Sequence, residues 1–322
     1  MANGPLLVGD IGGTNARFAL VGNAAEYHSE RVFLCEHFAS PESAIRAYLD
    51  EVGAKSPDVI CLAAAGPVIG GRCQLTNNPW ELDEGHLGLE FASDCVALIN
   101  DFTAVAFGLP GFAAEHCMPI GCFDALCLDG DFTVAVLGPG TGLGAGGLVQ
   151  RGEFRMPLVS EAGHVGFAPE TELQRDVLRV LAGRLPRVSC ERVLSGAGVQ
   201  NLYTALCELG GQAAELRLAS EIFAHSQTNP TSLARRATDL FFEILGQVAG
   251  DLALTLGADD GVFIAGGIAQ RYPQMLQASA FRVGFENKGR HRELLERVPT
   301  LLISHPHPGL FGAAEHARRL AT

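Results

Sequence analysis

The chain has 322 residues, of which 48% are hydrophobic and 18% charged, so it is long enough for two lobes and has the composition of a folded protein. Its formal net charge is −13. Nucleic acids and anionic membranes bind to basic protein surfaces, so neither is expected as a partner. The nine cysteines are scattered without a Cys-x-x-Cys pair and no export signal is found, so reduced thiols, no zinc site and a cytoplasmic location are expected.

The first predicted elements form a strand–turn–strand hairpin. Residues 6–8 and 17–21 are apolar and extended in character. The glycine-rich residues 9–15 between them predict a turn that requires positive φ at its glycines. A strand, not a helix, is expected after this turn.

Two buried strands and a helix follow. Residues 57–65 predict a strand that enters a Gly-Pro turn, and residues 95–100 predict another strand. Asp101 then opens a helical run over residues 102–108. The Leu-Pro-Gly sequence around Pro110 is expected to end this helix and to mark a lobe boundary.

The second half of the chain repeats the hairpin. Residues 132–137 predict a strand, residues 138–144 a glycine loop, and residues 147–150 a second strand. Thr14 and Thr141 occupy matching places in the two loops. Two hairpins of one design suggest two related lobes around a cleft.

Helices dominate the remainder. Thr171 and Gln174 have the spacing of a capping box before a helix that stops at Gly183. Apolar residues at three- and four-residue steps predict a long, buried helix over residues 233–256, ended by a glycine. Residues 261–267 predict a strand that stops at a double glycine before another helix. Strands that alternate with helices predict the α/β class.

The two glycine loops are candidate phosphate sites. The backbone N–H groups of such a loop can converge on a phosphate, and Thr14 and Thr141 add hydroxyl donors. Asp10 fits there if a cation lies between it and the phosphate, and Mg²⁺ binds in this way through waters and one or two carboxylates. The alternative is that each loop is only a tight turn, since Asp and Gly are turn formers.

Two other nucleotide-binding motifs are excluded. Neither Lys55 nor Lys288 has the Gly-Lys-Ser/Thr context of a Walker A loop. Residues 142–147 match G-x-G-x-x-G, but a short strand and a turn follow, not the helix that a dinucleotide fold requires. A nucleotide-dependent dehydrogenase is therefore not expected.

Asp101 is the candidate general base. It lies at the carboxyl end of a buried strand, which borders the ligand crevice in open α/β sheets, and it can accept the proton of an attacking alcohol. Because Asp is also a good helix N-cap, capping alone would explain it. Glu161, His164 and Glu191 are candidate ligands for sugar hydroxyls, which both donate and accept hydrogen bonds. Metal binding, or a surface or capping role, is the alternative for these three residues.

Several segments, in order along nearly the whole chain, resemble the motifs of bacterial glucokinases. They are residues 9–17, which resemble the phosphate-1 motif, and residues 100–104, 138–144, 161–164, 191–196, 263–268 and 308–313. The chain lacks the cysteine cluster that binds zinc in the repressor/open-reading-frame/kinase glucokinases, so it is similar to the zinc-free bacterial group. Two residues depart from that group: Ala162 stands where glycine is usual, and Gly166 stands where an acid is expected before Phe167.

The resemblance implies a two-lobed hexokinase/actin-like (ribonuclease H-like) α/β fold with a ligand cleft between the lobes. The smaller lobe would comprise residues 1–110 with 305–322, and the larger lobe residues 111–304. The implied reaction is ATP-dependent phosphorylation of glucose at its 6-hydroxyl, the first step of glycolysis, with Mg²⁺ and in a homodimer. A same-fold kinase for another hexose and a non-catalytic sugar sensor are the alternatives.

The resemblance also implies roles for single residues. Asp101 would be the catalytic base on the 6-hydroxyl, and Asn100, Glu161, His164 and Glu191 would bind the other hydroxyls. The two glycine loops would bind the ATP phosphates, and the C-terminal double glycine would lie near the adenosine. No metal ligand is expected beyond a possible contact of Asp10 with Mg²⁺ through water. The implied ATP-binding residues are Gly9, Asp10, Ile11, Gly12, Gly13, Thr14, Gly140, Thr141, Gly142, Gly266 and Gly267.

Overall fold

The computed structural model describes residues 4–22, 27–75, 78–123, 126 and 128–321. The chain divides into two compact units: unit 1 is Met1–Phe112 with His305–Thr322, and unit 2 is Ala113–Ser304. Unit 1 is therefore built from two separate stretches of chain, whereas unit 2 is continuous. Within the described ranges, no helix has both the length and the apolar composition needed to cross a membrane.

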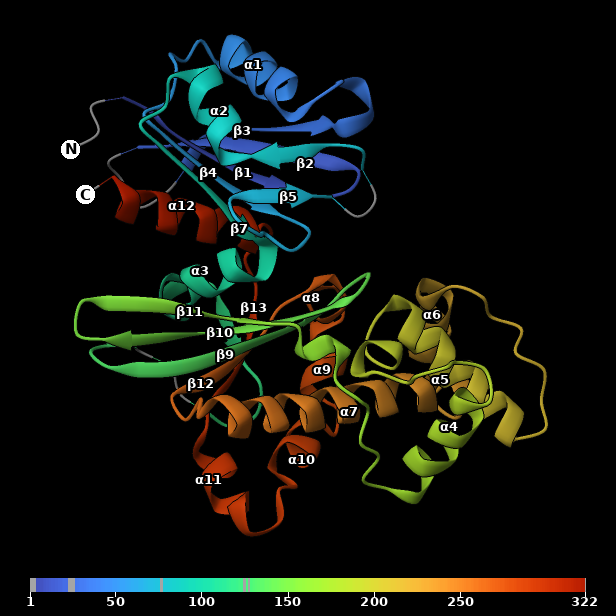
Figure 1. Ribbon diagram of the computed structural model, residues 1–322. Coiled ribbons are helices and arrows are strands. Elements are labelled where there is room, and N and C mark those ends of the chain that lie inside the picture. Colours follow the sequence, from blue (N-terminus) through green and yellow to red (C-terminus); the bar gives the residue numbers. More distant parts are fainter. Residues whose placement is uncertain (1–3, 23–26, 76–77, 124–125, 127, 322) are drawn as a thin grey trace. The chain divides into compact units, whose positions relative to one another are not determined.

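Unit 1 is centred on a five-stranded sheet in the order β3-β2-β1-β4-β7 (Figure 1). β1 pairs antiparallel with β2 and parallel with β4, and β4 pairs parallel with β7. The carboxyl ends of β1, β4 and β7 therefore lie at one edge of the sheet. A separate two-stranded sheet is formed by β5 and β6. These strands are β1 (Leu6–Ile11), β2 (Asn15–Val21), β3 (Tyr27–Leu34), β4 (Val59–Ala64), β5 (Arg72–Gln74), β6 (Glu81–Asp83) and β7 (Cys95–Asn100).

Helices cover both faces of this sheet, because successive strand residues point to opposite faces. Leu7 and Ile11 of β1 belong to a core shared with α1 and α2, whereas Val8 belongs to a core shared with α12. Figure 1 shows α1 and α2 on one side of the sheet and α12 on the other. The last helix of the chain thus packs on its first strand. The helices of unit 1 are α1 (Pro41–Val52), α2 (Glu84–Phe91), α3 (Asp101–Glu115) and α12 (Pro308–Leu320), with the short 3₁₀ helix η1 (Cys35–His37).

The helix that follows β7 does not end at Pro110. α3 continues through the Leu-Pro-Gly sequence, so the predicted break is wrong. A proline inside a helix removes one backbone hydrogen bond, but α12 packs on the helix at both sides of Pro110, since a Cβ at Gly108 or Gly111 would lie 3.1 or 2.8 Å from the Phe311 ring. Gly312 of α12 approaches so closely that a Cβ there would lie 1.7 Å from the carbonyl oxygen of Ala104. The division between the units falls inside α3, after Phe112.

Unit 2 contains a six-stranded sheet in the order β11-β10-β9-β12-β13-β8. β9, β10 and β11 pair antiparallel, β12 runs parallel to both β9 and β13, and β8 closes the edge antiparallel to β13. The strands are β8 (Cys117–Pro119), β9 (Phe132–Pro139), β10 (Leu143–Arg151), β11 (Phe154–Ser160), β12 (Gly261–Ile264) and β13 (Thr300–Ile303).

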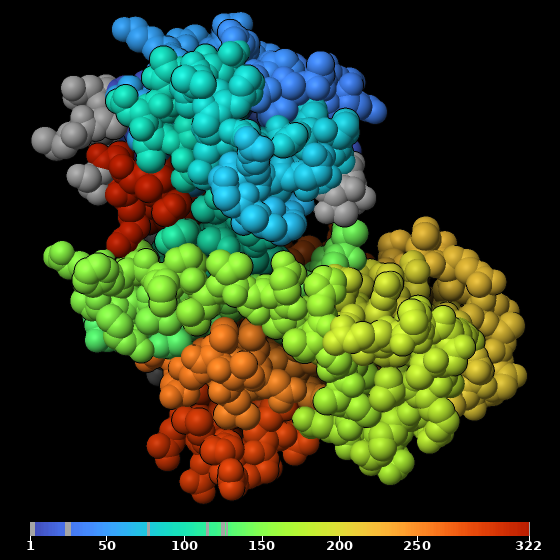
Figure 2. Space-filling view, viewed as in Figure 1, coloured from blue at the N-terminus to red at the C-terminus, as the bar shows by residue number. Residues whose placement is uncertain are grey.

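The helices of unit 2 share one large hydrophobic core. α4, α5 and α6 gather around the amino-terminal part of α7, and Figure 2 shows their surface in yellow-green to yellow. These helices are α4 (Glu172–Ala182), α5 (Gly196–Leu209), α6 (Ala219–Thr228), α7 (Leu233–Leu256), α8 (Gly267–Arg271), α9 (Pro273–Gln277), α10 (Phe281–Glu286) and α11 (Arg292–Arg297), with the 3₁₀ helices η2 (Ala162–His164), η3 (Cys190–Arg192) and η4 (Gly289–His291).

The long buried helix α7 has the predicted bounds. Gly257, with a φ of 64°, ends it in the left-handed conformation that glycine adopts at little cost. α10 crosses α7 at a glycine, since a Cβ at Gly246 would lie 1.9 Å from the carbonyl oxygen of Phe281. The apolar periodicity therefore identified a helix that is covered on several sides.

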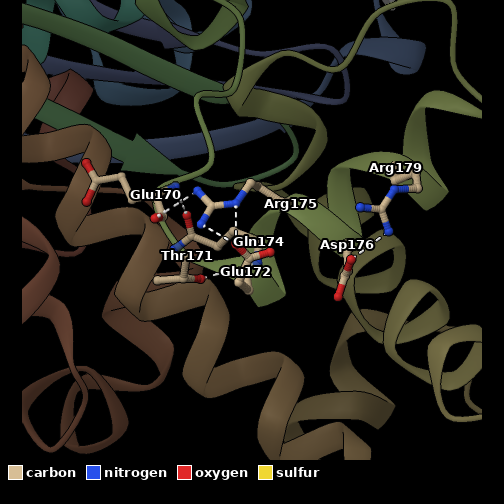
Figure 3. Close-up of polar contacts among 7 residues, drawn as sticks. All are labelled: Glu170, Thr171, Glu172, Gln174, Arg175, Asp176 and Arg179. Carbon is tan, nitrogen blue, oxygen red and sulfur yellow. Dashed lines mark hydrogen bonds and ion pairs between the residues drawn. The ribbon is translucent and has the colours of Figure 1, made fainter.

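The start of α4 is capped as predicted (Figure 3). Thr171 Oγ1 accepts a hydrogen bond from the N–H of Gln174 at 3.2 Å. The Gln174 side chain accepts from the N–H of Glu170 at 2.7 Å, one residue before the position that a full capping box would use. Arg175 pairs with Glu172 at 2.8 Å on the first turn.

Both glycine-rich hairpins are present, but their strands run farther than predicted. β1 extends to Ile11 and β9 to Pro139, so the turns are limited to residues 12–14 and 140–142. The two threonines are both exposed but not in register, since Thr14 is the last residue of its turn and Thr141 the middle one.

The glycines of the first hairpin provide space, not an unusual backbone conformation. None of Gly9, Gly12 and Gly13 has a positive φ, so that prediction is wrong. A Cβ at Gly9 would lie 2.7 Å from the side chain of Leu62 on the neighbouring strand β4. The N–H of Gly12 donates to the carbonyl of Asn15 at 2.9 Å and closes the turn.

Candidate active site

Asp10 lies near the carboxyl end of β1, at the sheet edge where β4 and β7 also end. Its carboxylate is 3.9 Å from the guanidinium of Arg17 on β2, and Arg17 is 3.0 Å from Glu30, which also pairs with His307 at 3.3 Å. A Cβ at Gly309 would lie 3.0 Å from Asp10 Oδ2. Asp10 is therefore held between β2 and the start of α12.

The electrostatics of Asp10 suit a nearby cation. Burial, reinforced by the carboxylate of Asp101 and opposed by Arg17, raises the pKa of Asp10 from 3.8 to about 6. The side chain still exposes 27% of its surface, so an ion or water can reach it. Mg²⁺ commonly binds to one or two carboxylates together with waters and substrate phosphates. Asp10 and Asp101 fit that pattern.

Asn100, the last residue of β7, caps α3. Its Oδ1 accepts hydrogen bonds from the N–H groups of Phe102 at 2.9 Å and Thr103 at 3.2 Å, and its Nδ2 donates to the carbonyl of Gly66 at 3.3 Å. Asp101 Oδ1 accepts from the Phe102 N–H at 2.9 Å. Asn100 therefore accepts two of these three hydrogen bonds at the start of α3. Helix capping, the alternative role considered for Asp101, is mostly performed by Asn100. Contact between Asn100 and a sugar hydroxyl stays a prediction.

In unit 2 the second glycine turn lies against the start of α5. The N–H of Gly196 donates to the carbonyl of Gly140 at 2.9 Å, and the N–H of Gly140 donates to the carbonyl of Gly142 at 2.8 Å. The first bond ties the turn to a helix amino terminus, which favours anions. Thr141 lies exposed at the tip of this turn.

Glu191 is fixed beside the same turn. Its Oε2 accepts a hydrogen bond from the N–H of Leu143 at 3.1 Å. A Cβ at Gly142 would lie 2.6 Å from that oxygen, so residue 142 must be small for the carboxylate to lie there. The glycine at position 142 thus also leaves space for the carboxylate of Glu191.

The double glycine after β12 contacts the end of β9. Gly266 has a φ of 86°, and a Cβ there would lie 2.4 Å from the carbonyl oxygen of Pro139. The N–H of Ala265 donates to the carbonyl of Leu137 at 2.9 Å. At Gly267, which begins α8, a Cβ would meet no atom within 4 Å. The double glycine and the second hairpin are therefore neighbours within unit 2.

Glu161 and His164 lie in an exposed segment after β11. His164 Nε2 is 3.9 Å from Glu161 Oε2, and the two side chains are 59% and 73% exposed, respectively. A Cβ at Gly163 would lie 2.0 Å from the carbonyl oxygen of Leu143, the residue whose N–H binds Glu191. Leu143 thus contacts both segments that carry the three predicted hydroxyl ligands.

Three ionisable residues of unit 1 were not singled out from the sequence. Arg17 was noted only as part of the phosphate motif, although it contacts Asp10 directly. Glu30 and His307 complete its network, and burial together with Arg17 lowers the pKa of His307. Glu30 lies on β3, the strand that pairs with β2, but His307 comes from the second stretch of chain that forms unit 1, so no local pattern could indicate its contact.

No metal cluster is built by the protein alone within the residues that the structure describes. Those residues contain no group of three or more His, Cys, Asp and Glu side chains suited to a metal ion. The eight described cysteines are free thiols, and Cys127 lies outside the described residues.

Known proteins share both this sequence and this fold. A family model described as glucokinase matches residues 7–320. A glucokinase of Chromohalobacter salexigens is 42% identical over 314 residues, which cover 97% of this chain and 97% of that protein. The crystal structure of a glucokinase from an Antarctic psychrotroph has a TM-score of 0.90 at 36% identity and covers 98% of this chain and 99% of that chain.

A more distant structure shares the fold alone. A ROK family glucokinase from Streptomyces griseus, solved in complex with glucose and AMPPNP, has a TM-score of 0.63 at 20% identity, with 98% of this chain and 100% of that chain covered. Together these structures confirm the α/β class and the hexokinase/actin-like fold that the sequence motifs implied.

Proposed function

The chain belongs to the glucokinase family, and from this premise we propose that it transfers the γ-phosphoryl group of ATP to the 6-hydroxyl of glucose. The match of the family model over residues 7–320 carries this conclusion. The S. griseus structure, which holds glucose and an ATP analogue, supports the same pair of substrates. We further propose that units 1 and 2 are the smaller and larger lobes of the enzyme.

Asp101 is the general base in this proposal. It begins α3 at the carboxyl end of β7, and Asn100 beside it supplies two of the cap's hydrogen bonds. A carboxylate in this position accepts the proton of the 6-hydroxyl as that oxygen attacks the phosphorus. Asp101 is thus proposed to perform chemistry beyond helix capping.

The remaining hydroxyls of the sugar are assigned to Asn100, Glu161, His164 and Glu191. Carboxylate, amide and imidazole groups can both position and discriminate hydroxyls, since each hydroxyl is a donor and an acceptor. The hydrogen bond from Leu143 to Glu191 and the contact of Gly163 with Leu143 support a common placement for the three residues of unit 2.

The ATP phosphates are assigned to residues 9–14 and 140–142, and the adenosine to Gly266 and Gly267. The tight turns, the amino terminus of α5 and the raised pKa of Asp10 support this assignment. Asp10 would hold Mg²⁺ through water, and such an ion neutralises phosphate charge as the phosphoryl group is transferred. The chain's own part is to align ATP and sugar and to exclude water.

The proposal extends to the setting of the enzyme. Phosphorylation of glucose would be the first step of glycolysis in the cytoplasm, and a homodimer is the expected assembly. Light scattering coupled to gel filtration tests the assembly directly, and a monomer at micromolar concentration would contradict it.

Two other functions are compatible with the fold: a kinase for another hexose and a non-catalytic sugar sensor. ADP release in the presence of ATP, Mg²⁺ and glucose, fructose, mannose or glucosamine separates them. We expect the highest kcat/KM with glucose. A higher value with another sugar would favour the first alternative, and no ADP with any sugar would favour the sensor.

Replacement of Asp101 tests the mechanism. Asp101→Asn keeps the shape but removes the base, so we expect turnover to fall by about 10²–10⁴-fold while ATP affinity changes little. The matched control is Asp94→Asn, because Asp94 is exposed just before the other end of β7. Full turnover in Asp101→Asn, with Asp94→Asn equally active, would overturn the assignment of the base.

A further inference from the structure

Unit 2 contains a partly open cavity, and Glu161 is the one described lining residue that is also assigned to the proposed reaction. Its volume is about 420 Å³, within the range of small-molecule pockets. One part of its lining is Ser160, the last residue of β11, with Glu161 and Gly166 of the segment that follows, and another part is the carboxyl-terminal half of α7. The cavity therefore lies against the segment that carries two of the proposed sugar ligands.

The walls of this cavity are mostly apolar. The lining includes the apolar residues Leu137, Val165, Val248, Leu252 and Leu256. Contact with such side chains favours an apolar ligand, since burial of apolar surface is the main driving force for binding in small pockets.

One buried polar group in the lining requires a hydrogen-bond donor. Gln247 of α7 is only 2% exposed, and its Oε1 has no hydrogen-bond partner among the residues that the structure describes. The orientation of the amide is fixed, because Nε2 donates to the carbonyl of Ala168, which can only accept. A buried acceptor without a donor costs free energy, so a ligand with one O–H or N–H gains by binding there.

Gly166 contributes open space. A Cβ at this position would meet no atom within 4 Å, and its φ is not positive, so a larger residue would fit without backbone strain. The segment is nevertheless held in place by hydrogen bonds from the N–H of Phe167 to the carbonyl of Val188 at 3.1 Å and from the N–H of Cys190 to the carbonyl of Val165 at 2.9 Å. The backbone at Gly166 is thus held in place, and this exposed residue lies at the open side of the cavity.

The charges around the cavity disfavour anions. Glu161 and Asp251 both line it, and Lys288, which is 5% exposed, pairs with Asp251 at 2.8 Å. Burial raises the pKa of the Cys190 thiol, also in the lining, to about 11, so this group is neutral. A negatively charged ligand would meet two carboxylates and no unpaired cation in the described lining.

From these features we propose that the cavity is a binding site for a neutral, largely apolar small molecule with one hydrogen-bond donor, and that its occupancy changes the affinity for glucose. The donor binds Gln247 Oε1, and the apolar part fills the space beside Gly166. Because Glu161 belongs both to the cavity lining and to the proposed sugar site, the two binding events are coupled.

Three probes with the same ring system test the binding site by titration calorimetry. 2-Naphthol has the donor, 2-methoxynaphthalene lacks it, and 2-naphthoate replaces it with a negative charge. We expect 2-naphthol to bind at least about threefold more tightly than the methoxy compound, and naphthoate to bind more weakly than both. No heat from 2-naphthol up to its solubility limit, or equal affinity for all three, would overturn the proposal.

Two variants locate the bound probe. Gly166→Leu fills the cavity and should abolish 2-naphthol binding, whereas Val159→Phe adds bulk on the preceding strand at a side chain that is 72% exposed and should leave it unchanged. If Gly166→Leu does not fold, Thr255→Phe at the exposed rim serves instead. Unchanged binding in the folded filling variant would place the probe elsewhere and refute the site.

Gln247→Leu tests the donor interaction specifically. This variant should bind 2-naphthol and 2-methoxynaphthalene with equal affinity, because the acceptor that distinguishes them is removed. A preference for 2-naphthol that persists in the variant would exclude Gln247 as its partner.

The coupling to glucose rests on the proposed function and is measured separately. Saturating 2-naphthol should change the KM for glucose at least about twofold and leave the KM for ATP unchanged. If calorimetry shows binding but the glucose KM is constant, the site stands and the coupling is refuted. If no hexose is phosphorylated, the proposed function fails while the calorimetric test of the site remains valid.

Discussion

Replacement of Asp10 by asparagine is expected to stabilise the protein in the absence of nucleotide. The pKa of this carboxyl is about 6 in the folded protein and 3.8 in the ordinary, unfolded environment. Between these pH values the folded state binds more protons at Asp10 than the unfolded state does. The free energy of unfolding therefore falls as the pH rises through this window, and it stays lower above pH 6. Asparagine has a similar shape but cannot ionise, so it avoids this loss.

The size of the effect follows from the pKa. A rise from 3.8 to about 6 corresponds to about 3 kcal/mol in the free energy of unfolding, since one pKa unit is about 1.4 kcal/mol. Asparagine gives up the charged contact with Arg17 at 3.9 Å, and the site is partly open to solvent. We therefore expect a net gain of about 1–2 kcal/mol at pH 7.5, or about 2–6 °C in Tm.

Urea unfolding followed by circular dichroism between pH 4.5 and 8 measures this difference. The stability gained by Asp10→Asn should be constant above about pH 6.5 and fall to about half near pH 5. Asp83→Asn is a control of opposite sign, because the N–H of His86 lowers the pKa of Asp83. The stability that the Asp83 carboxylate provides is present above its unfolded pKa and is lost as the pH falls.

Two results would refute this reasoning. The first is that Asp10→Asn is no more stable than the natural protein at pH 7.5. The second is a gain that does not change between pH 8 and pH 5. Because the same carboxylate is proposed to hold Mg²⁺, the stabilised variant should also have lower turnover, which a coupled ADP-release assay measures.

Three further predictions concern packing, capping and the metal. Gly312→Ala should lower the free energy of unfolding by about 3 kcal/mol or more in urea titrations, because its Cβ would lie 1.7 Å from the carbonyl oxygen of Ala104. Gly183→Ala, whose nearest neighbouring atom would lie at 3.4 Å, is the matched control and should change it by less than about 0.5 kcal/mol. Thr171→Ala removes the cap of α4 and should cost about 1 kcal/mol in the same assay, most of which Thr171→Ser restores. EDTA should abolish ADP formation and excess Mg²⁺ should restore it; activity that survives chelation would contradict a cation beside Asp10.

Elements defined by local patterns were predicted well from the sequence. The bounds of α7 follow from its apolar periodicity and from Gly257, whose left-handed backbone ends the helix. The strand at Cys95–Asn100 was also predicted with its observed bounds, because a continuous apolar run ends at polar residues. In both cases the determining interactions lie within a few residues of each other.

The errors arise where distant residues decide the structure. Pro110 is a helix breaker by local rules, yet packing between Gly312 and Ala104 holds α3 and α12 together and the helix continues. Gly9 lacks positive φ and is needed because Leu62 approaches from another strand. Sequence spacing cannot reveal such approaches.

The candidate site shows the same division. Asp10 was predicted from its place in a glycine-rich turn and Asp101 from its place after an apolar strand, and their roles stay predictions. The network of Arg17, Glu30 and His307 depends on contacts between separate segments of the chain. Helix capping was considered as the alternative role of Asp101 and not for Asn100, because the sequence does not indicate which of two adjacent polar side chains folds back on the helix.

The packing of α12 on β1 and β4 has a consequence for protein synthesis. Unit 2 is one continuous stretch and is translated in full before α12, whereas unit 1 lacks this helix until residues 308–320 have been translated. Until then, Val8, Cys61 and Ala63 have no cover from Leu310 and Ala313. The nascent chain therefore carries an open apolar sheet face from the synthesis of β4 until α12 is made, and a product truncated before α12 would be prone to aggregation.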